Sequence, residues 1–341
     1  IGSIAKDAMT KPGGDKYGIT NGEHPLLVVV PTFSTKSIVQ STPVSGQTNT
    51  LTVTLTANYE LTAGSSTKVT ITELTGSTTA TSASLAVTTC DDKLGTAGDW
   101  SDSGSLILTA SSTLASNTEC VITFQLTNPT SDQTTSPSVS VEAALTDGTS
   151  SIGSIAKDAM TKPGGDKYGI TNGEHPLLVV VPTFNTKSIV QSTPVSGATN
   201  LMTVTLNANY ELTAGTSDAT VTISGLTGST TTTASDLAVT TCSSSSLGTT
   251  GDWDKATGTL ILTLATTVAA GTNCAITFNL GNPTSDQTTS PSVSVQAALT
   301  DGSSSIGSIA QAAMTKPGGD KYGITNGEHP LLVVVPTFNT K

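Results

Sequence analysis

The chain consists of two full copies of one sequence unit and the opening of a third. Residues Ile1–Phe33 recur letter for letter as Ile152–Phe184, and a third start follows at Ile306. The starts at 1, 152 and 306 lie 151 and 154 residues apart. A fixed period of this size indicates one folding unit copied in tandem rather than one large domain. Because the sequence begins and ends inside a repeat, we expect a processed product or a window on a longer chain.

Composition favours a β-rich extracellular protein. Charged residues make up 11% and aromatic residues 4%, whereas serine and threonine account for about a third of the chain. Threonine suits half-exposed strands and serine suits turns. The net charge is −11 and every basic residue is lysine. Arginine is the preferred residue for binding phosphate through two hydrogen bonds. Because the sequence has no arginine, we expect no nucleic-acid partner. The longest apolar run, Leu26–Val30, is too short to cross a bilayer, and membrane insertion is not expected either.

The cysteines fall one pair to each copy, Cys90 with Cys120 and Cys242 with Cys274. No CxxC spacing or neighbouring histidine points to a metal site. Matched positions in a Ser/Thr-rich setting predict one disulfide within each unit, and therefore an oxidising compartment. The competing interpretation is buried free thiols.

Hydrophobic residues alternate with polar ones along most of each copy. Segments around Leu51–Leu55, Val69–Ile71, Cys120–Leu126 and Val139–Ala143 follow this period of two, with turn signals between them. About seven short strands of this kind predict an antiparallel β-sandwich. The predicted organisation is a joint segment over 1–25 that ends a preceding repeat, a sandwich over 26–145, an ordered joint over 146–176, a second sandwich over 177–304, and a further joint with the first strand of a third repeat over 305–341.

The joint is the segment in which we expect assembly residues. It contains glycine and proline residues typical of turns, together with apolar residues that a flexible linker does not need. The apolar run after it lacks alternation, which is typical of a strand buried on both faces. That run is either the first strand of its own sandwich or a strand that pairs with a neighbouring domain or subunit. The predicted assembly residues are Leu26, Val28, Val30, Ile155, Met160, Tyr168, Leu177, Val179, Val181, Leu331, Val333 and Val335.

Residues with catalytic or ligand-binding potential are few. The three histidines His24, His175 and His329 are equivalent residues of the repeat, so we interpret them as turn residues and expect no enzyme. Acidic pairs such as Asp91-Asp92 lack a calcium-binding loop pattern, so no metal or other cofactor is expected. Trp100 and Trp253 each follow Gly-Asp. We interpret them as core residues, with a sugar-stacking platform as the alternative.

N-glycosylation is excluded because Asn128 and Asn282 are followed by proline and no other Asn-x-Ser/Thr acceptor occurs. Hydroxyl-rich loops instead predict covalent O-glycans, with plain solvated hydroxyls as the alternative. The candidate glycan carriers are Thr78, Thr79, Thr134, Thr135, Thr230, Thr231, Thr288 and Thr289.

Several blocks resemble a known class of repeat. They include Pro31-Thr32-Phe33, Asn49–Leu55, Gly98-Asp99-Trp100 and Ser136–Val141. Together they are similar to tandem repeats of large secreted or cell-surface proteins of microalgae and related protists. Bacterial Ig-like adhesin repeats fit the same blocks less well. The resemblance implies an extracellular, Ig-like, glycosylated structural array and carries over no catalytic residue.

We therefore expect an all-β chain of tandem Ig-like sandwiches with ordered linkers, in an extracellular fibre or cell-surface filament. The filament would grow by self-association or by covalent tandem continuation. The alternative function is an adhesin or carbohydrate-binding module that uses Trp100 and Trp253.

Overall fold

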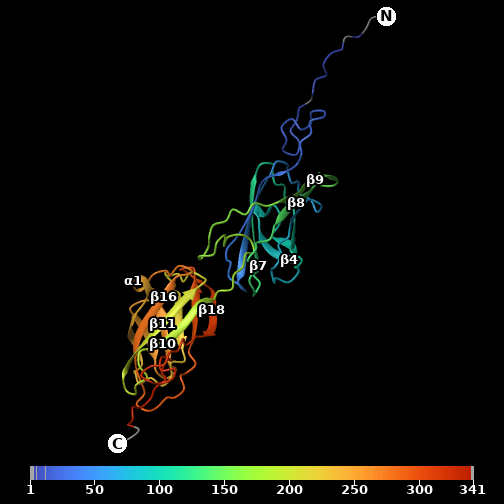
Figure 1. Ribbon diagram of the computed structural model, residues 1–341. Coiled ribbons are helices and arrows are strands. Elements are labelled where there is room, and N and C mark those ends of the chain that lie inside the picture. Colours follow the sequence, from blue (N-terminus) through green and yellow to red (C-terminus); the bar gives the residue numbers. More distant parts are fainter. Residues whose placement is uncertain (1–3, 5, 12, 339–341) are drawn as a thin grey trace. The chain divides into compact units, whose positions relative to one another are not determined.

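A computed structural model describes residues 4, 6–11 and 13–338 (Figure 1). The chain divides into two compact units. Unit 1 comprises Ile1–Gly165 and Asn172–Val180, and unit 2 comprises Asp166–Thr171 and Val181–Lys341. The division interleaves the two units along the sequence, because a six-residue stretch of unit 2 lies inside the sequence of unit 1.

Each unit is built almost entirely from antiparallel strands, as the alternating pattern predicts. The strands of unit 1 are β1 (Phe33–Gln40), β2 (Thr48–Ala57), β3 (Lys68–Thr72), β4 (Ser82–Thr88), β5 (Ala97–Ser101), β6 (Ser105–Thr109), β7 (Glu119–Thr127), β8 (Ser140–Thr146) and β9 (Ser151–Ala159), with a 3₁₀ turn η1 (Cys90–Asp92). Unit 2 repeats them as β10 (Phe184–Gln191), β11 (Thr199–Ala208), β12 (Thr220–Ser224), β13 (Ala234–Thr240), β14 (Thr250–Asp254), β15 (Thr259–Thr263), β16 (Asn273–Gly281), β17 (Ser294–Thr300) and β18 (Ser305–Ala313), with the short helix α1 (Cys242–Ser245).

The strands of unit 1 follow the order β1-β2-β7-β4-β5-β6-β3-β8-β9, and unit 2 has the same order. Strand β4 turns the corner of the sheet. Its end at Val87 and Thr88 pairs with β7, whereas its start at Ser82 pairs with β5. The sheet thereby encloses one core, to which strands on both sides of β4 contribute buried side chains.

The structure has nine strands in each unit, not the predicted seven or so. The first strand is β1, beginning at Phe33, and not the apolar run that begins at Leu26. β1 and β9 bury only some of their residues, and β5 is five residues long with a glycine in it. These strands carry too weak an apolar alternation to stand out in the sequence.

The predicted boundary between the sandwiches, at 176/177, is also wrong. Val179 pairs with Gln133 and Val180 with Val44, all within unit 1. The run therefore is not the first strand of the second sandwich. The alternative prediction is the correct one, because the run pairs with a neighbouring domain, the one that precedes it.

Candidate functional site: the segment that closes each unit

The last part of each unit is supplied by the opening of the next sequence repeat. We call this stretch the closing segment: residues 151–180 in unit 1, residues 305–334 in unit 2, and residues 4–29, as far as the structure describes them, for the N-terminal copy. It comprises strand β9 or β18 and the irregular chain that follows. At its middle lies a tip loop, Asp166–Thr171, with copies at Asp15–Thr20 and Asp320–Thr325.

Backbone hydrogen bonds fix the closing segment of unit 1 along its length. After β9 pairs with β8, the amide of Thr161 donates to Lys36 and its carbonyl accepts from Ile38 of β1. Val179 exchanges two hydrogen bonds with Gln133, at 2.8 and 2.9 Å. This is the geometry of a strand added to the edge of a sheet, in which main-chain hydrogen bonds provide most of the attraction between the segment and the unit.

A hairpin turn and two ion pairs hold β9 against its neighbours. Asp147 accepts hydrogen bonds from the amides of Ser150 and Thr149, which lowers the pKa of its carboxyl to about 2. Lys157 pairs with Glu73 at 2.9 Å, and Asp158 pairs with Lys36 at 3.0 Å. These exposed pairs orient β9 more than they stabilise it.

The buried amide of Gln40 fastens the second half of the segment. Its Nε2 donates to the carbonyls of Gly173, at 2.9 Å, and Leu178, at 2.7 Å. Its Oε1 accepts from Asn49, whose amide also donates to Asn128. These polar groups are buried, so their partners must be present for the unit to close without a desolvation penalty.

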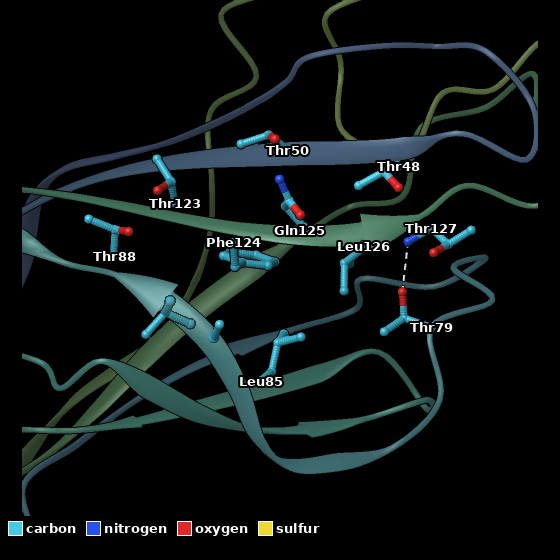
Figure 2. Close-up of a pocket in the computed structure, with 12 residues that line it drawn as sticks. Thr48, Thr50, Thr79, Leu85, Thr88, Thr123, Phe124, Gln125, Leu126 and Thr127 are labelled. Carbon is cyan, nitrogen blue, oxygen red and sulfur yellow. Dashed lines mark hydrogen bonds between the residues drawn. The ribbon is translucent and has the colours of Figure 1, made fainter. Parts of the chain in front are cut away.

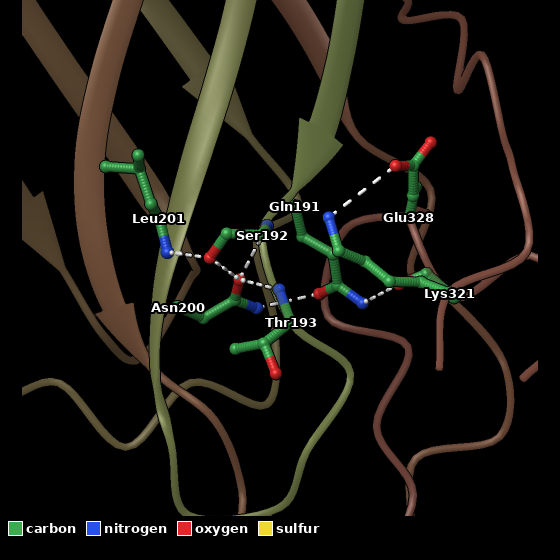
Figure 3. Close-up of polar contacts among 8 residues, drawn as sticks. Gln191, Ser192, Thr193, Asn200, Leu201, Lys321 and Glu328 are labelled. Atoms are coloured by element: carbon green, nitrogen blue, oxygen red, sulfur yellow. Dashed lines mark hydrogen bonds and ion pairs between the residues drawn. The ribbon is translucent and has the colours of Figure 1, made fainter. Parts of the chain in front are cut away.

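Unit 2 repeats this network with the third copy of the segment (Figure 3). Gln191 donates to Gly327 at 2.9 Å and to Leu332 at 2.7 Å, and accepts from Asn200 at 2.7 Å. Its backbone amide donates to Glu328, and Lys321 lies 3.6 Å from a carboxylate oxygen of Glu328. Gln40 and Gln191 thus make the same contacts, each with the closing segment of its own unit. The closing segment is therefore a feature of the repeat and not of one unit.

The tip loop contacts the unit that follows it in sequence. In unit 1, Tyr17 stacks on Tyr59 at 5.4 Å between ring centroids, and its carbonyl accepts from Glu60. In unit 2, Tyr168 lies 5.5 Å from Tyr210, and the amide of Glu211 donates to Tyr168. One closing segment thus contains residues that belong to each of two units.

Burial of the predicted assembly residues follows the copy in which they lie. Leu177 and Val179 in unit 1, like Leu331 and Val333 in unit 2, are 0% exposed, and Ile155 and Met160 are also buried. The N-terminal equivalents are open: Leu26 is 97%, Val28 83% and Val30 74% exposed. Tyr168, Val181 and Val335 are half-buried. Sequence alone does not show which copies are covered.

Both tryptophans are fully buried, at 0% exposure. Trp100 donates from Nε1 to the carbonyl of Thr79 at 3.1 Å, and Trp253 to Thr231 at 3.2 Å. The alternative of exposed sugar-stacking platforms is therefore wrong, and the core interpretation is correct.

Each unit contains one disulfide, Cys90–Cys120 in unit 1 and Cys242–Cys274 in unit 2. Cys120 of β7 is fully buried, so the bridge ties the 3₁₀ turn after β4 to the core. No helix in the described part of the chain has the length and apolar character needed to cross a membrane.

The candidate glycan carriers divide into two groups. Thr78, Thr134, Thr135, Thr230, Thr288 and Thr289 are exposed. Thr79 and Thr231 are half-buried, and their hydroxyls accept from the amides of Thr127 and Gly281 at 2.7 Å. The hydroxyl of the exposed Thr230 also donates to a backbone carbonyl, that of Asn282, at 3.3 Å.

Thr79 also lines a shallow groove of about 490 Å³ beside β4 and β7 (Figure 2). Threonine and glutamine side chains alternate there with apolar ones, and no lining residue ionises. This groove contains no general acid or base.

The histidines serve as turn residues: the amide of His24 donates to Asn21 and its carbonyl accepts from Leu27. Asp15 caps the same loop by accepting from the amide of Asn21 at 2.9 Å. Within the residues that the structure describes, no cluster of three or more His, Cys, Asp or Glu is placed to hold a metal ion.

No family model and no curated protein matches this sequence. Among solved structures, the chain is similar to the C-terminal domain of the AgI/II polypeptide BspA of Streptococcus agalactiae, with a TM-score of 0.42 and 9% identity over 83% of this chain and 99% of that one. It is also similar to the major pilin SpaA of Corynebacterium diphtheriae, with a TM-score of 0.24 and 12% identity over 78% and 63% of the two chains. At these values the likenesses carry no functional conclusion.

Proposed function

We propose that the chain is a structural repeat of an extracellular fibre or cell-surface filament, without enzymatic activity. The observation that carries the proposal is the closing segment, which completes one unit while its tip loop belongs to the next. A repeat built in this way cannot finish folding without the opening residues of its successor. Linear continuation is therefore built into the folding unit itself.

The remaining features support an outer location. Each unit contains one disulfide, and disulfides form and persist in oxidising compartments. The exposed threonines are accessible to O-glycosylation. The nine-stranded unit supports an Ig-like classification through its antiparallel sheet, which turns a corner at β4. The likeness to repeats of microalgal surface proteins stays a prediction and belongs to this proposal.

The test is length scaling. Chains of two, four and six units would be measured by small-angle X-ray scattering and by electron microscopy. We expect the maximum dimension to rise in proportion to the number of units, since each closing segment is hydrogen-bonded along one unit while its tip loop belongs to the next. A dimension that grows only as the square root of unit number, as for beads on flexible linkers, would refute the structural role.

Non-reducing mass spectrometry of material from the source tests the location. We expect both disulfides together with added hexose masses on exposed threonines. Free thiols and an unmodified mass would overturn the extracellular assignment while leaving the scaling result intact.

A further inference from the structure

We propose that each unit is a load-bearing clamp, in which the first strand and the closing segment together resist tension applied along the chain. The proposal rests on the proposed structural role, because a fibre repeat passes its load through the points where the chain enters and leaves each unit. It gives the closing segment a second function, namely mechanical resistance that depends on the direction of the pull.

The first observation is that the closing segment runs parallel to the start of its own unit. In unit 2, Ser188 of β10 lies opposite Thr315 in a parallel bridge, and Val195 lies opposite Val334 in another. Residue numbers therefore rise in the same direction on both sides of the clamp. Two parallel bridges occur at the equivalent positions of unit 1, Ser37 with Thr161 and Val44 with Val180.

Parallel pairing puts the entry and the exit of the unit at opposite ends of the clamp. In unit 2 the chain enters β10 at Phe184, and the closing segment ends at Val334, which bonds beyond the far end of β10. Tension between these two points pulls the paired segments past each other along their length. The hydrogen bonds between the segments then lie across the pull and share it, so the clamp is loaded in shear.

The second observation is that five backbone hydrogen bonds cross the clamp, with donor–acceptor distances between 2.8 and 3.2 Å. Both paired segments lie wholly within the described part of the chain. Unit 1 has the same five bonds at equivalent positions. In unit 2 the amides of Ile189, Gln191 and Ser196 donate to the carbonyls of Thr315, Glu328 and Val334, and the amides of Thr315 and Val334 donate to those of Lys187 and Pro194.

The buried side chain of Gln191 reinforces the middle of the clamp (Figure 3). Its amide donates to Gly327 at 2.9 Å and to Leu332 at 2.7 Å, across the same boundary as the backbone bonds. A hydrogen bond shielded from water is electrostatically stronger than an exposed one. Gln191 therefore connects the two parallel bridges into one continuous line of contacts.

The experiment compares two directions of pull on unit 2 of the full chain by single-molecule force spectroscopy. One handle is fused to the C-terminus, and the other is attached by maleimide to one new thiol, because the native cysteines are all in disulfides. In the Thr183→Cys chain the load enters directly before β10 and shears the clamp. In the Thr199→Cys chain it enters close to the Ser196–Val334 bond and opens the clamp from that end.

We expect the unfolding force to be about two- to fivefold higher for the Thr183→Cys chain, because five hydrogen bonds share the load in shear but meet it singly in the other direction. Both threonines are exposed, so the two chains should have the same urea midpoint without load. Equal forces, or a higher force for the Thr199→Cys chain, would overturn the proposal.

The disulfide identifies the unfolding event. Reduction of Cys242–Cys274 should lengthen each event by about 110 Å, from a separation of 32 residues at about 3.4 Å per residue. An event whose length ignores reduction does not come from unit 2 and is left out of the comparison. The length scaling of arrays is measured without load, so equal forces would remove the clamp and leave the proposed structural role standing.

Discussion

Leu177 provides the sharpest test of where one unit ends, because the same residue occurs in three copies with opposite burial. Leu177→Ala removes a fully buried side chain from unit 1. Truncating a buried leucine costs about 2–5 kcal/mol, from lost transfer free energy and from the cavity left behind. For a unit of this size each kcal/mol lowers the melting temperature by about 2–4 °C, so unit 1 should melt about 4–20 °C lower.

The other two copies supply the controls. Leu331→Ala should lower the free energy of unfolding of unit 2 by a similar amount, because Leu331 is equally buried. Leu26→Ala should change either unit by less than about 0.5 kcal/mol, as expected of an exposed position. The backbone φ is positive at all three leucines, so its contribution cancels in the comparison.

Each unit reports its own unfolding through one buried tryptophan. In a Trp253→Phe background, fluorescence follows Trp100 in unit 1, and in a Trp100→Phe background it follows unit 2. Leu177→Ala should shift only the Trp100 transition. A shift confined to the Trp253 transition would show that residues 177–180 belong to the second unit, and an equal effect of Leu26→Ala would show that burial is not the cause.

Three further perturbations follow from the same contacts. Gln40→Leu should destabilise unit 1 by about 3 kcal/mol or more in urea titration, because two buried carbonyls and the Asn49 amide lose their partner. Gln125 is exposed, so Gln125→Leu is the near-neutral control. Equal urea midpoints for the two variants would contradict the network. Replacing Cys90 and Cys120 by serine should cost about 3–4 kcal/mol through the 30-residue separation, and an unchanged urea midpoint would argue against it. The carboxyl of Asp147 has a pKa lowered to about 2, so its contribution is present above pH 3.8 and is lost as pH falls through 2. Asp147→Asn should therefore be less stable than wild type at pH 7, with a difference that shrinks below pH 3.8 and vanishes only below pH 2. A pH-independent difference would exclude the charge as the cause.

The sequence predicted the all-β class, the cysteine pairs and the core strands, because each leaves a local mark. Alternation along β2, β3 and β7 is visible in any window of five residues. It did not predict that residues 177–180 close the preceding unit, since apolar runs are alike whichever sheet they join. It also missed Gln40, Asn49 and Asn128. A buried amide network has no sequence period, and its only signal was the recurrence of Gln191, Asn200 and Asn282 at matching positions.

The fold explains why the repeat is most uniform at its joint. Residues 1–46 and 152–197 differ only at Ser34, which is Asn185 in the second copy, whereas the loop after Cys90 changes from Asp91-Asp92 to serines. A loop residue has to fit one unit. A residue of the closing segment has to fit the unit that precedes it in sequence. It must also leave the tip loop free to form its contacts within the unit that follows. Substitutions there are constrained from two sides.

It follows that the folding unit and the sequence repeat are out of register by one closing segment. A chain of residues 31–180 contains all nine strands of unit 1 and the segment that closes it, with Leu177 and Val179 in place. A chain of residues 1–150 has the same length, one disulfide and one tryptophan, but it carries the closing segment at the wrong end. Four buried apolar side chains, Ile155, Met160, Leu177 and Val179, then have no counterpart inside the groove. Burying side chains of this size stabilises by about 1.5–3 kcal/mol each, so their loss is comparable to the whole stability of a domain. Calorimetry should show one cooperative transition for residues 31–180 and none for residues 1–150 at monomer concentrations. Equal cooperativity in both chains would mean that the unit closes without the segment.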